Sequence, residues 1–120
     1  IEAAVQGGPL RVHGDGEQSR DFTFVDSVCA VITDAVRNRV SDPEPVNLAF
    51  GSRVTLLELI ALLETILGKE LTRDHQPART GDVRHSQADQ TKLRSLFPDV
   101  AAVSLEEGLR RTIAWFAANA

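Results

Sequence analysis

The chain has 120 residues, of which 42% are hydrophobic and 25% are charged, and its formal net charge is −4. These values are ordinary for a soluble globular protein, so we expect residues 1–120 to form a single domain with a modest core. The negative charge argues against a nucleic-acid surface, and no apolar stretch is long enough to span a bilayer. The only cysteine, Cys29, cannot form an internal disulfide, so a cytoplasmic location is expected.

Turn residues and the spacing of apolar side chains divide the chain into short alternating elements. In the first half we expect a helix, two strands, a helix and a strand at residues 1–7, 10–13, 22–25, 26–40 and 46–50. In the second half we expect a helix, a strand and two helices at residues 56–67, 71–75, 90–96 and 105–116. The pattern predicts an α/β fold of about four helices with three or four short strands.

The starts of the helices are marked by capping residues. Asp26 and Asp89 are the expected N-caps of the second helix and of the short fourth one. Residues 55–58 and 104–107 have the Thr/Ser-x-x-Glu spacing of a capping box. Cys29 falls on the apolar stripe of the second helix, so we expect it to be a core residue and not a nucleophile.

Residues 46–50, Val-Asn-Leu-Ala-Phe, are typical of a buried strand that has neighbours on both sides. The rest of the chain supplies few strands that could fill those places. Because an unpaired apolar strand edge tends to recruit another chain, we expect self-association, most simply as a homodimer.

Two distant turns each combine arginine, aspartate and small residues beside an apolar segment. The first covers residues 14–26 and contains Arg20, and the second covers residues 79–89 and contains Arg79. A guanidinium offers a planar fork of donors to phosphate oxygens, and glycine lets the backbone approach a ligand closely. Two such turns brought together would suit a bound diphosphate. Taken alone, Arg20 and Asp21 would be a surface pair worth less than ~1 kcal/mol.

The sequence of residues 14–26, Gly-Asp-Gly-Glu-Gln-Ser-Arg-Asp-Phe-Thr-Phe-Val-Asp, resembles a segment of the NAD-dependent sugar-nucleotide epimerases and dehydratases. These proteins are extended short-chain dehydrogenases/reductases. Residues 79–82, Arg-Thr-Gly-Asp, resemble the family's Arg-x-Gly-Asp segment, and the bare Gly-Asp favours the UDP-glucose 4-epimerase branch. The resemblance extends from Ile1 to the helix that begins after Ser104.

The resemblance implies that the chain binds the nucleotide end of a UDP-sugar. It places Arg20 and Arg79 at the diphosphate and Asp82 at the ribose, because a carboxylate can accept hydrogen bonds from both ribose hydroxyls. It places beside the nucleotide base the strand that carries Arg11, Val12 and His13. The neighbouring residues 84–86 are also typical of the epimerase branch, and we interpret them as structural.

No residue is assigned to catalysis or to metal binding. The three histidines lack metal-ligand spacing to one another or to Cys29. The family's amino-terminal half, with its NAD-binding turn, catalytic Ser/Thr and Tyr-x-x-x-Lys pair, has no counterpart here, and the sequence contains no tyrosine. The pair Gly14 and Gly16 is not a dinucleotide fingerprint, since it lacks a third glycine and a following helix. We therefore expect no cofactor in this segment and no activity of the segment alone.

The resemblance thus implies a partial, carboxyl-terminal portion of an extended Rossmann-type fold. One hypothesis is a truncated or excised substrate-binding portion of a UDP-sugar 4-epimerase-like protein. A second is a non-catalytic module that keeps the fold for self-association or partner binding. A third is a part of a complete enzyme. The opening at Ile1, which reads as the interior of a helix, favours a partial chain.

Overall fold

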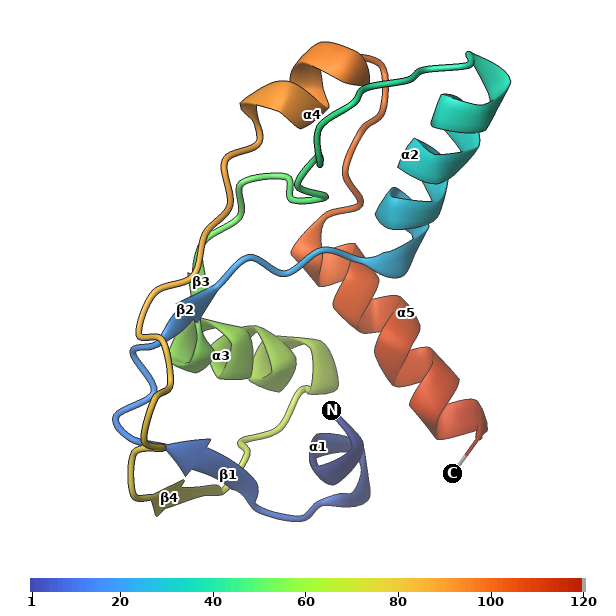
Figure 1. The fold of residues 1–120 in the computed structure, drawn as a ribbon. Helices are drawn as coiled ribbons and strands as arrows, with labels where there is room; N and C mark the ends of the chain where they lie inside the picture. Colours follow the sequence, from blue (N-terminus) through green and yellow to red (C-terminus); the bar gives the residue numbers. More distant parts are fainter. Residues whose placement is uncertain (120) are drawn as a thin grey trace.

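Five helices and four short strands make up residues 1–119, the part of the chain that the computed structural model describes (Figure 1). The helices are α1 Glu2–Gln6, α2 Val25–Arg37, α3 Leu56–Leu67, α4 Thr91–Leu96 and α5 Leu105–Ala118. The strands are β1 Leu10–His13, β2 Ser19–Arg20, β3 Val54–Thr55 and β4 Arg73–Gln76. The α/β class predicted from the sequence is confirmed.

The strands form two separate two-stranded ladders. β1 runs parallel to β4, with Leu10 opposite Arg73 and His13 opposite Gln76. β2 runs antiparallel to β3. A single parallel bridge between Ser19 and His85 attaches the second arginine turn to β2. The two ladders therefore bring residues 10–20 next to residues 73–86, which are far away in the sequence.

Two small clusters of buried side chains take the place of one continuous core. The first, between α1, α3 and α5, contains Ala4, Leu63, Leu71 and Leu109. The second, between α2 and α4, contains Val31, Leu93 and Phe97. The molecule measures 47 × 35 × 20 Å, and its radius of gyration of 16.6 Å exceeds the about 14 Å expected for a compact domain of this length. The clusters lie towards opposite ends of this long shape (Figure 1).

Helix α3 follows directly from its local sequence. The predicted capping box is present: the Thr55 hydroxyl accepts a hydrogen bond from the Glu58 amide at 3.1 Å, and the Glu58 carboxylate accepts one from the Thr55 amide at 2.7 Å. Gly68 ends the helix in the left-handed conformation, with φ of 64°. At the start of α5, the Ser104 hydroxyl accepts from the Glu107 amide at 3.2 Å, and the return bond of a capping box is not formed.

Residues 46–50 do not form the predicted strand. The segment has no ladder partner within residues 1–119, although Ala49 is buried and Phe50 is half-buried. The short strands within residues 1–119 pair with each other elsewhere, so none of them forms a ladder with this segment. A strand is a property of a pair of segments, and the apolar run alone was insufficient to establish one.

Helix α2 also differs from its predicted orientation. It begins at Val25, one residue earlier than expected, and Asp26 lies in the first turn, where it pairs with Arg111 at 2.9 Å instead of capping the helix. The buried face contains Ser27 and Val31. The predicted apolar stripe faces outward, so the expectation that Cys29 is a core residue is wrong.

A buried hydrogen bond to Ser27 accounts for the orientation of α2. The Ser27 hydroxyl is 1% exposed and accepts a hydrogen bond from the Val103 amide at 2.9 Å. This bond turns the Ser27 side of the helix towards the chain between α4 and α5. Ile32 and Val36 are consequently 54% and 74% exposed. Helix α2 thus carries an apolar stripe that the described chain leaves uncovered.

Candidate functional site

A polar cavity of about 160 Å³ lies where β1 and β4 end. Because the two strands are parallel, their carboxyl ends meet, and the turn after β1 lies beside residues 77–79 that follow β4. The cavity is lined by His13, Gly14, Asp15, Gln18, Ala78, Arg79, Asp82 and Arg84. The two arginine turns therefore share one cavity, as the sequence analysis anticipated.

Glycine is required in both turns. Gly16 has a φ of 86°, and a Cβ atom there would lie 2.7 Å from a methyl carbon of Leu57. Gly81 has a φ of 82°, and the Asp82 amide closes its tight turn by donating to the Arg79 carbonyl at 3.2 Å. Left-handed backbone of this kind strains residues with a side chain, so both turns depend on glycine at these positions.

His13 and Arg79 form a direct contact across the cavity. The Nη2 atom of Arg79 lies 3.0 Å from Nε2 of His13, and Nδ1 of His13 lies 3.3 Å from the Pro77 carbonyl. A guanidinium can only donate, so Nε2 of His13 accepts. Nδ1 is then the ring atom that donates to the Pro77 carbonyl, and the His13 ring orients Arg79.

Arg20 reaches the same place from β2. Its Nη2 atom lies 2.6 Å from Oδ1 of Asp82, and the two side chains are 32% and 40% exposed. Its Nη1 atom donates to the Ser19 carbonyl at 2.8 Å and to the Arg84 carbonyl at 3.4 Å. The guanidinium is therefore held at three points while one of its edges still meets solvent.

Asp21 has a structural role beside the site. Its carboxylate accepts hydrogen bonds from the Ser52 hydroxyl at 2.7 Å and from the Gly51 amide at 3.2 Å. Within residues 1–119 it makes no hydrogen bond or ion pair with Arg20, whose carboxylate partner is Asp82. Asp21 therefore satisfies a backbone amide and does not hold Arg20.

Asp15 and Arg84 form the outer rim of the cavity. They are paired at 2.9 Å, and both side chains are more than half exposed. The pKa of Asp15 is lowered from its ordinary value, first by the Glu17 amide that donates to it and then by Arg84. Sequence analysis did not assign Arg84 to the cavity. Its place two residues after Asp82, at the far end of a tight turn, was the signal that could have done so.

The six residues predicted to bind substrate divide into two groups. His13, Arg79 and Asp82 line the cavity, and Arg20 joins it through Asp82. Val12 is 1% exposed in the interior, and Arg11 lies at a second, apolar cavity of about 310 Å³ between β1 and α3. The structure brings the first four together, and the side chains of the other two point elsewhere.

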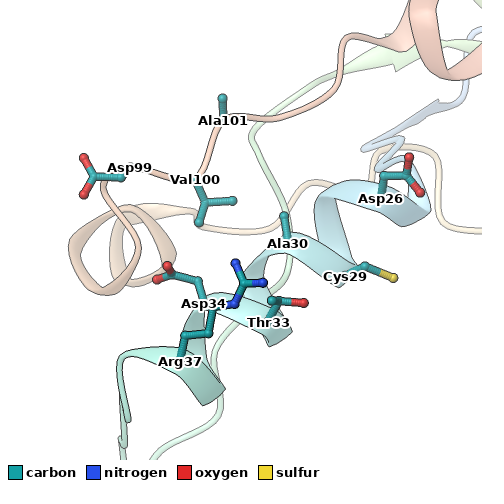
Figure 2. Close-up of a pocket in the computed structure, with 9 residues that line it drawn as sticks. All are labelled: Asp26, Cys29, Ala30, Thr33, Asp34, Arg37, Asp99, Val100 and Ala101. Atoms are coloured by element: carbon teal, nitrogen blue, oxygen red, sulfur yellow. The ribbon is translucent and has the colours of Figure 1, made fainter.

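A larger hollow of about 450 Å³ lies between α2 and the segment that follows α4 (Figure 2). Its charged residues, Asp26, Asp34, Arg37 and Asp99, are spread along its length and do not converge on one point (Figure 2). Within residues 1–119 no group of three His, Cys, Asp or Glu side chains could hold a metal ion. None of the helices described is both long and apolar enough to cross a membrane. The cavity at the arginine turns is therefore the better candidate site.

Comparison with known proteins finds several UDP-sugar epimerases, although no family model matches the chain. The chain is 32% identical over 117 residues to a UDP-glucuronate 4-epimerase of Thermodesulfobacterium geofontis. The aligned region covers 92% of this chain and 34% of that protein. It is 32% identical to the uncharacterized UDP-glucose epimerase YtcB of Bacillus subtilis, over 96% of this chain and 36% of that protein. The chain belongs to the sugar-nucleotide epimerase/dehydratase family.

Solved structures of epimerases have the same fold over this region. The UDP-glucose 4-epimerase of Thermotoga maritima, solved with UDP-glucose, is 34% identical, with a TM-score of 0.87 over 98% of this chain. The UDP-glucuronic acid 4-epimerase of Bacillus cereus, solved with UDP-glucuronic acid and NAD, is 27% identical, with a TM-score of 0.89 over 99% of this chain. In each case 38% of the epimerase chain is matched. The chain thus corresponds to a partial, carboxyl-terminal portion of the extended short-chain dehydrogenase/reductase fold and spans about a third of its curated relatives.

Proposed function

We propose that this chain is the part of a UDP-sugar 4-epimerase-like protein that binds the nucleotide end of a UDP-sugar. The observation that carries the proposal is the convergence of Arg20, Arg79 and Arg84 around one cavity, in a chain whose net charge is −4. A diphosphate supplies the negative charge that such a cluster attracts, and guanidinium groups bind it through paired hydrogen bonds.

Each of the three arginines is already paired with a neighbour, which defines how a ligand would enter. Arg20 is bound to Asp82, Arg79 to His13 and Arg84 to Asp15. A diphosphate would replace Asp82 as the partner of Arg20, and the released carboxylate could then accept hydrogen bonds from a ribose. The backbone of β1, with Arg11, Val12 and His13, would lie on the side of the base.

A UDP titration by calorimetry tests this proposal. We expect weak binding, with a dissociation constant of ~1 mM, or about −4 kcal/mol. Arg79→Ala should weaken it by about tenfold, because a charged hydrogen bond to phosphate is worth at least about 1.4 kcal/mol. Arg110→Ala is the matched control, since Arg110 pairs with Glu106 on the outer face of α5. Equal heats for the wild type and Arg79→Ala would remove Arg79 from the site.

We also propose that the described segment performs no hydride transfer by itself. The residues present do not fit a dinucleotide: the turn containing Gly14 and Gly16 leads from β1 into β2, and not into a helix N-terminus that could hold a pyrophosphate. The sequence has no tyrosine to act as the base. Incubation with NAD and UDP-glucose should yield no UDP-galactose. Turnover that survives repurification and is lost in Arg20→Ala would contradict this.

The alternative function, a non-catalytic module that associates with itself or a partner, is favoured by the exposed apolar stripe of α2. The UDP titration separates the two, because a module of this kind would not need Arg20 or Arg79. A homodimer and a cytoplasmic location remain predictions from the sequence.

A further inference from the structure

The side chain of Ser19 lies at the joint between the two arginine turns and is 1% exposed. Its backbone bridges the second turn: the Ser19 amide donates to the Arg84 carbonyl at 2.9 Å, and the Ser86 amide donates to the Ser19 carbonyl at 3.1 Å. Its hydroxyl lies 2.9 Å from Nδ1 of His85 and 3.3 Å from Nε of Arg53. Ser19 thus connects β2 to the second arginine turn through its backbone and through its side chain.

The chemistry of the three groups determines which atom carries each proton. Nε of Arg53 can only donate, so the Ser19 hydroxyl oxygen accepts from it. The hydroxyl proton then has Nδ1 of His85 as its acceptor, which requires that Nδ1 is unprotonated and that Nε2 carries the ring proton. Every polar atom of Ser19 is satisfied in this arrangement. Without the His85 acceptor, the buried hydroxyl proton would have no partner among the described contacts.

The orientation of Arg20 depends on the same joint. Its guanidinium is held by the carbonyl oxygens of Ser19 and Arg84 and by the carboxylate of Asp82. Two of these three acceptors, at Arg84 and Asp82, belong to the second turn, and that turn is attached to β2 through Ser19 and His85. A movement of the turn away from Ser19 would therefore release Arg20 without removing any charge from the site.

We propose that His85 is a positioning residue for the nucleotide site, acting through Ser19 to hold Arg20 and the Arg79 turn in one arrangement. This inference rests on the proposed function for the identity of the ligand, UDP. It assigns the role to Nδ1 of His85. The ring is exposed, and within residues 1–119 its Nε2 atom makes no hydrogen bond. A direct contact with the ligand would use Nε2 instead.

Two substitutions at His85 separate these roles. The side-chain oxygen of His85→Asn lies close to the place of Nδ1 and can still accept from Ser19, whereas the amide of His85→Gln reaches the place of Nε2. His85→Leu removes both. In UDP titrations we expect His85→Leu and His85→Gln to bind about tenfold more weakly than wild type and His85→Asn to stay within about threefold. Equal binding by wild type and His85→Leu, or rescue by Gln and not by Asn, would overturn the proposal.

Amide hydrogen exchange without ligand tests the joint independently of UDP. The Ser19 and Ser86 amides should exchange at least about tenfold faster in His85→Leu than in wild type, and His85→Asn should restore their protection. Amides in the middle of α3 serve as the internal control for intact folding. If wild type fails to bind UDP, the proposed function is wrong, while the exchange result still decides whether His85 holds the turn. Unchanged exchange in His85→Leu would show that it does not.

Discussion

Helices α2 and α3 have nearly the same length, 13 and 12 residues, yet they differ in capping and in how their apolar faces are buried. α3 has a capping box at its start and a glycine at its end, and it buries Ile60 and Leu63, the latter in the cluster shared with α1 and α5. α2 has no side-chain cap at its start and leaves its apolar stripe exposed. The difference teaches that a stripe of apolar residues predicts a helix. Which side of that helix is buried depends on the other elements that pack against it.

The uncovered stripe of α2 is continuous with the segment that failed to form a strand. Ile32 and Val36 line a groove of about 320 Å³ together with Val46 and Leu48. The apolar side chains that suggested a buried strand are thus gathered beside those that suggested a buried helix face. Both expectations went wrong in the same place, and for the same reason: the described chain has no further layer there.

The largest effect should come from a cavity in the α3 core. Leu63→Ala is expected to lower the free energy of unfolding by about 2–5 kcal/mol, because Leu63 is 4% exposed and its truncation leaves a cavity beside Ala4, Leu71 and Leu109. Val36→Ala on α2 should change it by less than about 0.5 kcal/mol, since Val36 is already largely hydrated. Urea denaturation measures both. Similar losses in the two variants would mean that the α2 face is covered in solution.

The α2 face also sharpens the prediction of self-association. We propose that two copies bury this groove against each other, with Ile32 near the centre. Ile32→Glu should then raise the dimer dissociation constant by at least about tenfold, or about 1.4 kcal/mol. Thr33→Glu is the matched control, because it adds the same charge at an exposed position beside the stripe. Sedimentation at micromolar concentration measures the fraction of dimer in each variant. A monomeric wild type would show that the grooves of two copies do not pair.

A smaller effect is expected at the start of α3. Thr55→Ala removes the hydroxyl that accepts from the Glu58 amide and should cost about 1 kcal/mol of stability. Thr65→Ala in the same helix is the control. The Thr65 hydroxyl donates to the Ala61 carbonyl at 2.9 Å, a bond that adds little to a helix already formed. If the two variants unfold at the same denaturant concentration, the capping box contributes nothing measurable.

Features encoded by neighbouring residues were predictable from the sequence. The capping box at Thr55 appears as predicted, and the two arginine turns lie together at one cavity. The i, i+4 spacing of Glu106 and Arg110 likewise accounts for their ion pair. Asp89 accepts from the Thr91 amide at 2.7 Å, but it lies one residue before Gln90, which is the N-cap of α4 in place of the predicted Asp89. Each depends on contacts within a few residues or on a motif that carries its own turn.

Features that depend on distant partners were not predictable. Nothing in the local sequence indicates that Ser27 will accept from Val103, and that bond decides which side of α2 is buried. The contact between His13 and Arg79, 66 residues apart, is equally invisible before β1 and β4 are known to pair. The hydroxyl of Ser19 beside His85 belongs to the same group. The candidate site could therefore be located from its motifs, but not the network that orients it.

The smallest predicted effect concerns acid and again involves α3. The pKa of Glu58 is lowered from its ordinary 4.5 mainly because the carboxylate accepts from the Thr55 amide and hydroxyl. The pKa of Glu64 is lowered mainly by the Leu71 amide, with help from Arg73. A carboxylate with a lowered pKa stabilises the folded chain fully above its unfolded pKa.

That contribution should disappear as the pH falls below about 4.5 and both groups become protonated. The stability of the wild type should therefore decrease on acidification, and the decrease should be shallower in Glu58→Gln/Glu64→Gln. Glu70→Gln is the control, because Glu70 is exposed and makes no hydrogen bond within residues 1–119. Melting temperatures between pH 7 and pH 3 measure the slopes. Parallel curves for the double variant and the wild type would place the acid-sensitive carboxylates outside α3.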